Sequence, residues 1–234
     1  MRWDWLGLNR RRAAPPLIVP PQFNRNSAKV TALMPPEQAG RWLLERMQQH
    51  VGFRTYANKT LLDFGCGVRF TQAILNTQLR IKRYAGVDID RAMIDFLRAS
   101  VDDRRFEYHF MDTYHPLYNT SGVPLSLSTT LPVGHDFDLV TMFSVITHQT
   151  PEDSRCIFTI LRRHVRKDGA LFFTCFLDAG IERFEDRSPA RNGGFCFFNR
   201  DFLVSLVEDC GWRIAGSAPA EGPIIGDSFV CRPA

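Results

Sequence analysis

The sequence predicts an α/β fold: a doubly wound, mostly parallel, seven-stranded sheet with helices on both faces. From residue 60 onward, short apolar segments alternate with segments whose apolar residues recur at helical spacing. This alternation is typical of a parallel sheet covered by helices, and right-handed crossovers make such a sheet doubly wound. The length of 234 residues, of which 44% are hydrophobic and 23% charged, is typical of a single globular domain.

The first 36 residues differ in composition from the rest. Residues 1–36 contain six of the 14 prolines, and we expect an extended arm without regular helix, because proline lacks the N–H donor that a helix needs. Residues 37–234 form the single predicted domain. Its first helix is expected to begin near Pro36 and to carry its apolar residues on one face: Leu43, Leu44, Met47 and Val51.

The later elements are defined by their apolar segments and by the residues at their ends. Strands are expected at residues 60–64, 84–88, 106–111, 137–143, 170–177, 212–217 and 228–231. Helices are expected at residues 68–79 and 91–101, after Thr150 and after Asn199. The helix after Thr150 is expected to bury Ile157, Ile160, Leu161 and Val165. The dipeptide at 168–169 is expected to turn the chain into the fifth strand.

Charge and cysteine content exclude several classes of protein. The net charge is +4, and residues 1–40 alone carry six basic and two acidic residues, so the remainder is net neutral. A neutral domain lacks the basic face that binds nucleic acid, and no apolar run approaches the ~18 residues of a membrane span. The six cysteines include no C-x-x-C pair. We therefore expect no nucleic-acid partner, no membrane span, no metal site and a cytoplasmic protein.

The strongest motif is the D-F-G-C-G segment at residues 63–67, between a predicted strand and a predicted helix. Glycines there allow a ligand close to the backbone, and the amides at a helix start favour a negative group such as a carboxylate. The acid before the glycines suits an ammonium group on the same ligand. A dinucleotide fingerprint needs glycine where Phe70 stands, so a nicotinamide cofactor is disfavoured. We assign this loop to cofactor binding: Asp63, Gly65, Cys66 and Gly67.

Three more segments lie at the carboxyl ends of predicted strands, at the same edge of the predicted sheet as the glycine loop. Asp88 ends the second strand, where a carboxylate can accept hydrogen bonds from a ribose diol, and Ile89 could lie against a flat adenine. Met111 and Asp112 follow the third strand, where the carboxylate could accept the adenine amine. Ser144 follows the fourth strand, which opens into the same site. All five residues are expected to contact the cofactor.

The order and spacing of these motifs resemble class I S-adenosylmethionine-dependent methyltransferases, over roughly residues 37–234. Residues 63–67 resemble their first motif, Asp88 their ribose-binding acid, Asp112 their adenine-side acid and residues 137–144 their fourth motif. Residues 167–171 resemble the turn before their fifth strand. The resemblance implies a Rossmann-like fold, S-adenosylmethionine as the cofactor and methyltransferase activity. Arg69 stands where most members carry a third glycine, which leaves the loop shape and the cofactor affinity open.

A narrower resemblance involves two short motifs. Y-N-T-S-G at residues 118–122 and S-V-I-T-H at residues 144–148 are similar to the Y-N-P-x-G and S-V-F-T-H motifs of a branch of small bacterial methyltransferases. Some members of that branch are encoded beside cell-surface saccharide genes. Thr120 replaces the proline and Ile146 the phenylalanine. This resemblance favours a saccharide-type acceptor.

His148 is the candidate catalytic residue, because it follows the fourth strand, where the transferred methyl group would lie. A neutral imidazole there could take a proton from an acceptor hydroxyl, and the alternative is a histidine that only packs under the loop. The long connection 112–136 is typical of a lid or substrate loop, although it could be a surface excursion. Its candidate substrate residues are Tyr114, His115 and Tyr118.

A second long connection, residues 178–198, leaves the fifth strand at the ligand end. Asp178 is a candidate substrate-binding acid, and no second acid stands beside it, so a magnesium site is not expected. The connection also contains phenylalanines that could wall an acceptor pocket or belong to the core: Phe195, Phe197 and Phe198.

We therefore expect methyl transfer from S-adenosylmethionine to a small-molecule or glycan-precursor acceptor, at oxygen, by in-line displacement. One alternative is a non-catalytic scaffold that acts through its N-terminal arm, and another is a nicotinamide-linked oxidoreductase. The arm itself carries Trp3, Trp5 and the arginines at 10–12, which could bind a protein partner or a second copy of the chain. The other interpretation of the arm is a segment lying on the body of the domain.

Overall fold

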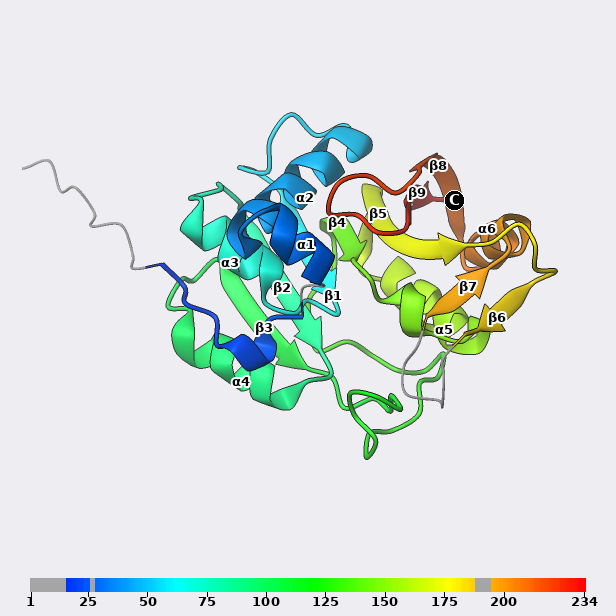
Figure 1. The fold of residues 1–234 in the computed structure, drawn as a ribbon, viewed down its shortest axis with the longest axis horizontal. Coiled ribbons are helices and arrows are strands. Elements are labelled where there is room, and N and C mark those ends of the chain that lie inside the picture. Colours follow the sequence, from blue (N-terminus) through cyan, green and yellow to red (C-terminus); the bar gives the residue numbers. More distant parts are fainter. Residues whose placement is uncertain (1–15, 26–27, 188–194) are drawn as a thin grey trace, which may run out of the picture.

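The computed structural model describes residues 16–25, 28–187 and 195–234, without the side chains of 28–30. Within these residues nine strands form one sheet, ordered β3-β2-β1-β4-β5-β7-β6, with β9 pairing β5 and β8 pairing β9 (Figure 1). The strands are β1 Thr60–Phe64, β2 Arg83–Asp88, β3 Phe106–Phe110, β4 Phe137–Met142, β5 Val165–Leu177, β6 Phe184–Asp186, β7 Cys196–Phe198, β8 Trp212–Ala218 and β9 Asp227–Pro233. The first five are parallel, so the predicted doubly wound fold is confirmed.

The prediction of seven strands is too low by two. The extra strands, β6 and β7, lie in the connection 178–198, which the sequence analysis treats as irregular. They form an antiparallel hairpin, and β7 pairs with the last residues of β5, Phe176 and Leu177. Each strand has only three residues, too few for an alternating pattern to be recognised in the sequence.

Helices cover both faces of the sheet. They are α1 Ala28–Leu33, α2 Pro36–Val51, α3 Arg69–Asn76, α4 Arg91–Ser100, α5 Pro151–Arg162 and α6 Arg200–Asp209, with short 3-10 turns at Pro21–Phe23 and Ile146–His148. The predicted caps are confirmed: the Thr150 hydroxyl accepts the Asp153 amide, and the Asn199 side chain accepts the amides of residues 201 and 202. No described helix is both long enough and apolar enough to cross a membrane.

Two apolar cores form because side chains of successive strand residues point to opposite faces of the sheet. Leu61 of β1 packs in the core beneath α2, α3 and α4, whereas Leu62 packs in the core beneath α5 and α6. Parallel strands covered on both faces are buried along their length, as all six residues of β4 are. In Figure 1 the two groups of helices lie on opposite sides of the sheet. The carboxyl ends of β1, β2 and β4 meet at the point where the strand order reverses.

The predicted turn at Asp168–Gly169 is wrong, because both residues lie inside β5. This strand begins at Val165, which is therefore not part of α5, and the pairing of β4 with β5 shifts register near Leu139. A Cβ at position 169 would lie 2.9 Å from the carbonyl oxygen of Phe137. Close approach of two backbones therefore explains this glycine.

The prediction that residues 1–36 contain no regular helix is also wrong. α1 forms because residues 22–34 contain no proline, and Figure 1 shows it near the centre of the molecule. Before it, Leu17 is buried and its amide donates to Asn76 Oδ1 at 2.8 Å, and Phe23 stacks on Phe96. Residues 16–25 therefore pack on the domain. Trp3, Trp5 and the arginines at 10–12 lie outside the described residues.

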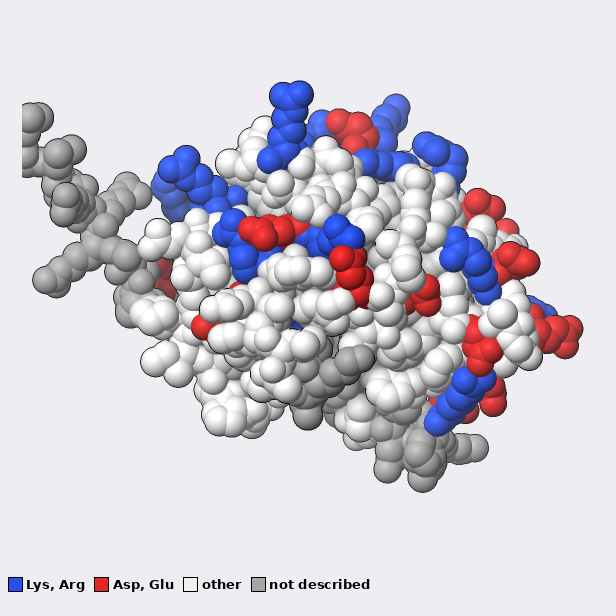
Figure 2. All heavy atoms as spheres, turned by 45° about the horizontal axis from the view of Figure 1, so that its top comes forward, with Lys and Arg blue, Asp and Glu red and all other residues white. Residues whose placement is uncertain are grey.

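Charged side chains of both signs are interspersed on the face shown in Figure 2. Blue groups predominate along its upper edge with a red group among them, red groups gather at its right edge, and the area at the lower left is mostly white. Acidic groups therefore lie among the basic ones on this face.

Candidate active site

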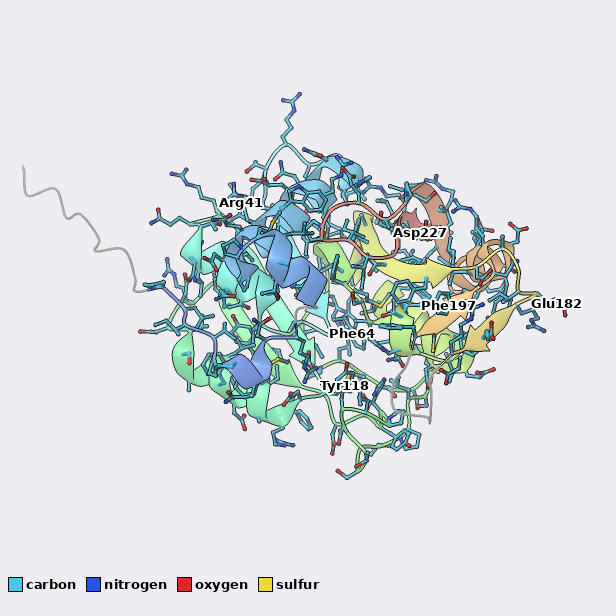
Figure 3. The ribbon with its side chains drawn as sticks, in the orientation of Figure 1. Arg41, Phe64, Tyr118, Glu182, Phe197 and Asp227 are labelled. Atoms are coloured by element: carbon cyan, nitrogen blue, oxygen red, sulfur yellow. The ribbon has the colours of Figure 1, made fainter. Side chains whose placement is uncertain are left out.

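A cavity of about 410 Å³ lies at the carboxyl ends of the central strands. One end is lined by the glycine loop and the ends of β1 and β2, and the other by the loops after β3 and β4 and the end of β5. Phe64, at the end of β1, and Tyr118, from the loop after β3, both line it and lie near the middle of the molecule in Figure 3. This size fits a small-molecule ligand.

The glycine loop adopts a backbone that other residues rarely adopt. Gly65 and Gly67 have φ values of +72° and +50°. The amides of Gly65 and Cys66 both donate to the carbonyl oxygen of Val87, which ties the loop to β2. A Cβ at Gly67 would meet nothing within 4 Å, so the loop is open above this residue. The loop therefore leaves room for a ligand close to its backbone.

Asp63 lies under this loop and is 1% exposed. Its Oδ2 accepts a hydrogen bond from the Tyr84 hydroxyl at 2.5 Å. Burial raises the pKa of Asp63 to about 8, although the bond from Tyr84 and the nearby Arg69 oppose that rise. Asp63 lines the cavity, as the sequence predicts.

Arg69 does not close the cavity but lines it. Its Cγ would lie 3.1 Å from a Cβ at Gly40 of α2, so this glycine leaves room for the arginine stem. The guanidinium lies 5.5 Å from the centroid of the Phe143 ring. Burial lowers the pKa of Arg69 to about 10, which leaves it a cation at neutral pH. Arg69 is thus a cation at this end of the cavity, and its charge favours the carboxylate form of Asp63.

Asp88 is held by two backbone amides. Its Oδ2 accepts from Gly67 and its Oδ1 from Asp90, both at 3.0 Å. Burial raises the pKa of Asp88, and these two bonds oppose the rise. Ile89 and Met111 line the cavity beside it with apolar side chains. This set of a fixed carboxylate and apolar walls suits a sugar diol attached to a flat ring.

Ser144, directly after Phe143, has a φ of +58°, and its amide donates to Thr174 Oγ1 at 2.8 Å. A left-handed serine is uncommon, and such backbone conformations cluster at functional sites. It lines the cavity together with Val145.

Two predicted site residues do not line this cavity. Asp112 lies in an adjoining hollow, which shares Ile89 and Tyr118 with the cavity. Its Oδ1 accepts from Asn119 Nδ2 at 3.0 Å. Asp178 pairs with Arg187 at 2.5 Å and accepts the Gly180 amide. The structure therefore uses both carboxylates to hold loops.

Aromatic and imidazole rings wall the other end of the cavity. The His148 ring lies 6.2 Å from the Tyr118 ring and 5.9 Å from the Phe195 ring, between centroids. Phe195 contacts Phe176 edge to face at 5.1 Å, and Tyr114 also lines this end. Phe195 is 49% exposed and walls the pocket, whereas Phe198 is fully buried in the core.

His115 stacks on Tyr118, with 4.9 Å between the ring centroids. Its Nδ1 accepts the Leu117 amide at 3.2 Å, and its Nε2 lies 3.3 Å from the carbonyl oxygen of His148. An acceptor Nδ1 implies that Nε2 carries the proton and donates to that carbonyl oxygen. Burial lowers the pKa of His115, which favours this neutral form. His115 thus joins the two loops at the acceptor end.

The motif at 118–122 forms a compact turn beneath this wall. Asn119 Nδ2 donates to the Thr113 carbonyl oxygen as well as to Asp112, and a Cβ at Gly122 would lie 2.4 Å from the Thr113 carbonyl carbon. These contacts explain why asparagine and glycine stand at positions 119 and 122. The turn forms although Thr120 replaces the proline of the motif.

Several residues that line the cavity are not predicted from the sequence. Arg25 pairs with Asp90 at 2.5 Å, and its guanidinium lies 4.5 Å from the centroid of the Tyr118 ring. Thr147 lines the cavity wall, and its buried Oγ1 has no hydrogen-bond partner among the described residues. No sequence signal marks Arg25, because its partners are 65 and 93 positions away. Thr147 could have been suspected from its place directly before His148.

The fold and this cavity together define a class I S-adenosylmethionine-dependent methyltransferase. The family described as "Methyltransferase domain" matches residues 26–215. The chain therefore belongs to this family of methyltransferases. The predicted enzyme class and the predicted cofactor, S-adenosylmethionine, are confirmed, and the scaffold and oxidoreductase alternatives are not supported.

Solved structures with the same fold act on different acceptor atoms. The glycopeptide N-methyltransferase MtfA, complexed with S-adenosylhomocysteine, has 11% identity and a TM-score of 0.59, over 85% of this chain and 90% of that chain. The Burkholderia thailandensis 1,6-didemethyltoxoflavin-N1-methyltransferase has 17% identity and a TM-score of 0.58, over 85% and 79%. The mitomycin 7-O-methyltransferase MmcR has 17% identity and a TM-score of 0.52, over 85% and 54%.

The residues at the glycine-loop end fit this cofactor. The methionine end of S-adenosylmethionine carries an ammonium and a carboxylate, and the acid Asp63 and the cation Arg69 both line this end of the cavity. Asp88 lines the cavity with a carboxylate, and Ile89 and Met111 line it with apolar side chains, groups that suit a ribose and an adenine. The open space above Gly67 leaves room for the ligand between them.

Proposed function

We propose that this enzyme transfers a methyl group to a hydroxyl oxygen of a small-molecule or glycan-precursor acceptor. The observation that carries the proposal is that one cavity contains both the cofactor-binding features and His148. We assign cofactor binding to the lining residues Asp63, Gly65, Cys66, Gly67, Asp88, Ile89, Met111 and Ser144. Asp112 contributes by holding Asn119 and the turn beside the adenine end.

The cofactor supplies a methyl group that is already activated on a sulfonium, so the protein mainly has to align the acceptor with it. The aromatic wall formed by Tyr114, Tyr118, Phe176 and Phe195 can hold a ring of the acceptor by stacking. In-line transfer needs the acceptor oxygen on the side of the methyl group that faces this wall.

We assign the role of general base to His148. A hydroxyl becomes a better nucleophile when a neutral imidazole accepts its proton during transfer. The Leu117 amide and the His148 carbonyl oxygen engage the two ring nitrogens of His115, so we assign His115 to joining the two loops. An amine acceptor loses its proton more easily than a hydroxyl does and so depends less on a general base. An imidazole in the cavity therefore favours an oxygen acceptor.

The acceptor chemistry is tested with wild-type enzyme, S-adenosylmethionine and matched acceptors that carry a phenol, a sugar hydroxyl or an amine on similar scaffolds. Mass spectrometry then detects the gain of one methyl group. We expect methylation of hydroxyl acceptors. Methylation of amines alone would overturn the assignment to oxygen.

The base is tested with His148→Asn and a matched control, His135→Asn, whose ring lies outside the cavity beside Arg163. His148→Asn is expected to lower kcat about 100-fold or more, with an unchanged Kd for S-adenosylhomocysteine. The control should keep both values. An unchanged kcat in His148→Asn would remove His148 from the mechanism.

A further inference from the structure

Tyr84 is a fully buried tyrosine that does not line the cavity but bonds to a residue that does. It lies on β2, opposite Leu61 of β1, and its hydroxyl reaches along the sheet to Asp63. The distance from the hydroxyl to Asp63 Oδ2 is 2.5 Å. Tyr84 donates to Oδ2 of Asp63, so this bond determines that Oδ1 is the oxygen that remains available to a ligand.

The other oxygen of Asp63, Oδ1, accepts no hydrogen bond from the described residues. Its charge is influenced by groups on every neighbouring element: Arg69 of α3 favours the carboxylate, whereas Asp88 of β2 disfavours it. Cys66 in the loop and Tyr108 of β3 are also close enough to interact with Asp63. Asp63 is thus a buried acid with one oxygen fixed by Tyr84 and the other available to the cavity.

From this arrangement we infer that Tyr84 is a positioning residue for the cofactor. Its hydroxyl orients Asp63 and favours the carboxylate form, so that Oδ1 can accept a hydrogen bond from the ammonium of the cofactor's methionine end. The inference rests on the proposed cofactor site, and it adds a residue that touches neither cofactor nor acceptor. Removal of the hydroxyl should weaken only those ligands that carry the ammonium.

The inference also links binding to pH. Burial raises the pKa of Asp63 to about 8, and the Tyr84 bond opposes that rise. Without the hydroxyl, the pKa of Asp63 rises further, and a larger fraction of Asp63 is neutral at pH 7. Replacing Tyr84 by phenylalanine is therefore expected to weaken binding of a ligand that carries the ammonium more strongly at pH 7 than at pH 8.5.

The experiment compares two ligands by calorimetry. S-adenosylhomocysteine carries the amino-acid end, whereas 5′-methylthioadenosine has the same adenosine and sulfur but no ammonium or carboxylate. Tyr84→Phe is expected to weaken S-adenosylhomocysteine about tenfold at pH 7 and to leave 5′-methylthioadenosine unchanged. Unchanged binding of the truncated ligand also shows that the variant is folded.

The matched control is Tyr108→Phe, which removes a buried hydroxyl from the neighbouring strand β3. That hydroxyl is bonded to Thr71 Oγ1 at 3.0 Å. Tyr108→Phe should bind both ligands like the wild type. Equal weakening of both ligands by Tyr84→Phe, or a loss that does not depend on pH, would overturn the inference. Failure of the wild type to bind either ligand would instead contradict the cofactor site itself.

Discussion

Arg25 forms an ion pair with Asp90, with 2.5 Å between Nη2 and Oδ2. Arg25 comes from the N-terminal segment, and Asp90 caps α4 two residues after Asp88. The same guanidinium lies over the Tyr118 ring at the acceptor end. One side chain therefore connects the cofactor end of the cavity, the acceptor loop and the segment before the first predicted helix.

We predict that Arg25→Ala weakens S-adenosylhomocysteine binding about three- to tenfold, because both the pair with Asp90 and the contact with Tyr118 are lost. The matched control is Arg41→Ala, which removes a surface pair with Glu45 of similar exposure outside the cavity. Exposed pairs contribute about 1 kcal/mol or less, so neither variant should change the unfolding free energy much. Calorimetry and thermal unfolding measure the two quantities. Equal Kd values for both variants would exclude Arg25 from the site.

Asp88→Ala is predicted to weaken S-adenosylmethionine and S-adenosylhomocysteine about 10- to 100-fold, because charged hydrogen bonds to the ribose are lost. The loss also frees the Gly67 amide that Asp88 holds. Asp95→Ala, at an exposed position on α4, is the control and should bind like the wild type. Wild-type affinity in Asp88→Ala, measured by calorimetry, would rule out the assigned ribose contact.

Two alanine substitutions in the glycine loop are predicted to have different effects. Gly65→Ala would place a Cβ 2.5 Å from Val145 Cγ2 at a φ of +72°, so we expect a loss of about 2 kcal/mol or more in unfolding free energy. Gly67→Ala has open space and should lose about 1 kcal/mol from its positive φ, but its new methyl group would face the cofactor.

Gly52→Ala is the control that separates the effect of backbone strain on stability from the effect on cofactor binding. Gly52 has a φ of +80° at the end of α2 and nothing within 4 Å, so its stability loss should equal that of Gly67→Ala. Only Gly67→Ala should lose cofactor affinity. Denaturant unfolding and calorimetry measure both effects, and equal affinities would place the cofactor away from the loop.

His164 is predicted to make stability depend on pH. Burial lowers its pKa below 6.5, and His135, stacked on it, and Arg163 add to that effect. The folded state therefore binds fewer protons than the unfolded state, and stability falls as the pH drops through about 6.5 and below. His164→Asn keeps a donor near the Gly134 carbonyl oxygen that the ring nitrogen contacts at 2.8 Å. Its unfolding free energy should fall less between pH 7.5 and 5.5 than that of the wild type. Parallel pH profiles would contradict the assignment.

The order of elements and the glycine-loop half of the site could be predicted from the sequence, because both depend on local patterns. Buried parallel strands are mostly short apolar runs, and the apolar residues of helices recur about every 3.6 residues. The loop residues that were predicted lie at or beside the ends of β1 and β2: Asp63, Gly65, Gly67 and Asp88. In a parallel sheet such ends must meet at one edge.

Long-range packing decided the rest. The β6–β7 hairpin, the continuous β5 and the place of Arg25 at the cavity depend on pairings between segments far apart in the chain, which no local pattern records. The same holds for Tyr84, which appears in the sequence as one more apolar strand residue. Its hydroxyl has a partner only because β1 and β2 lie side by side, which brings it within 2.5 Å of Asp63.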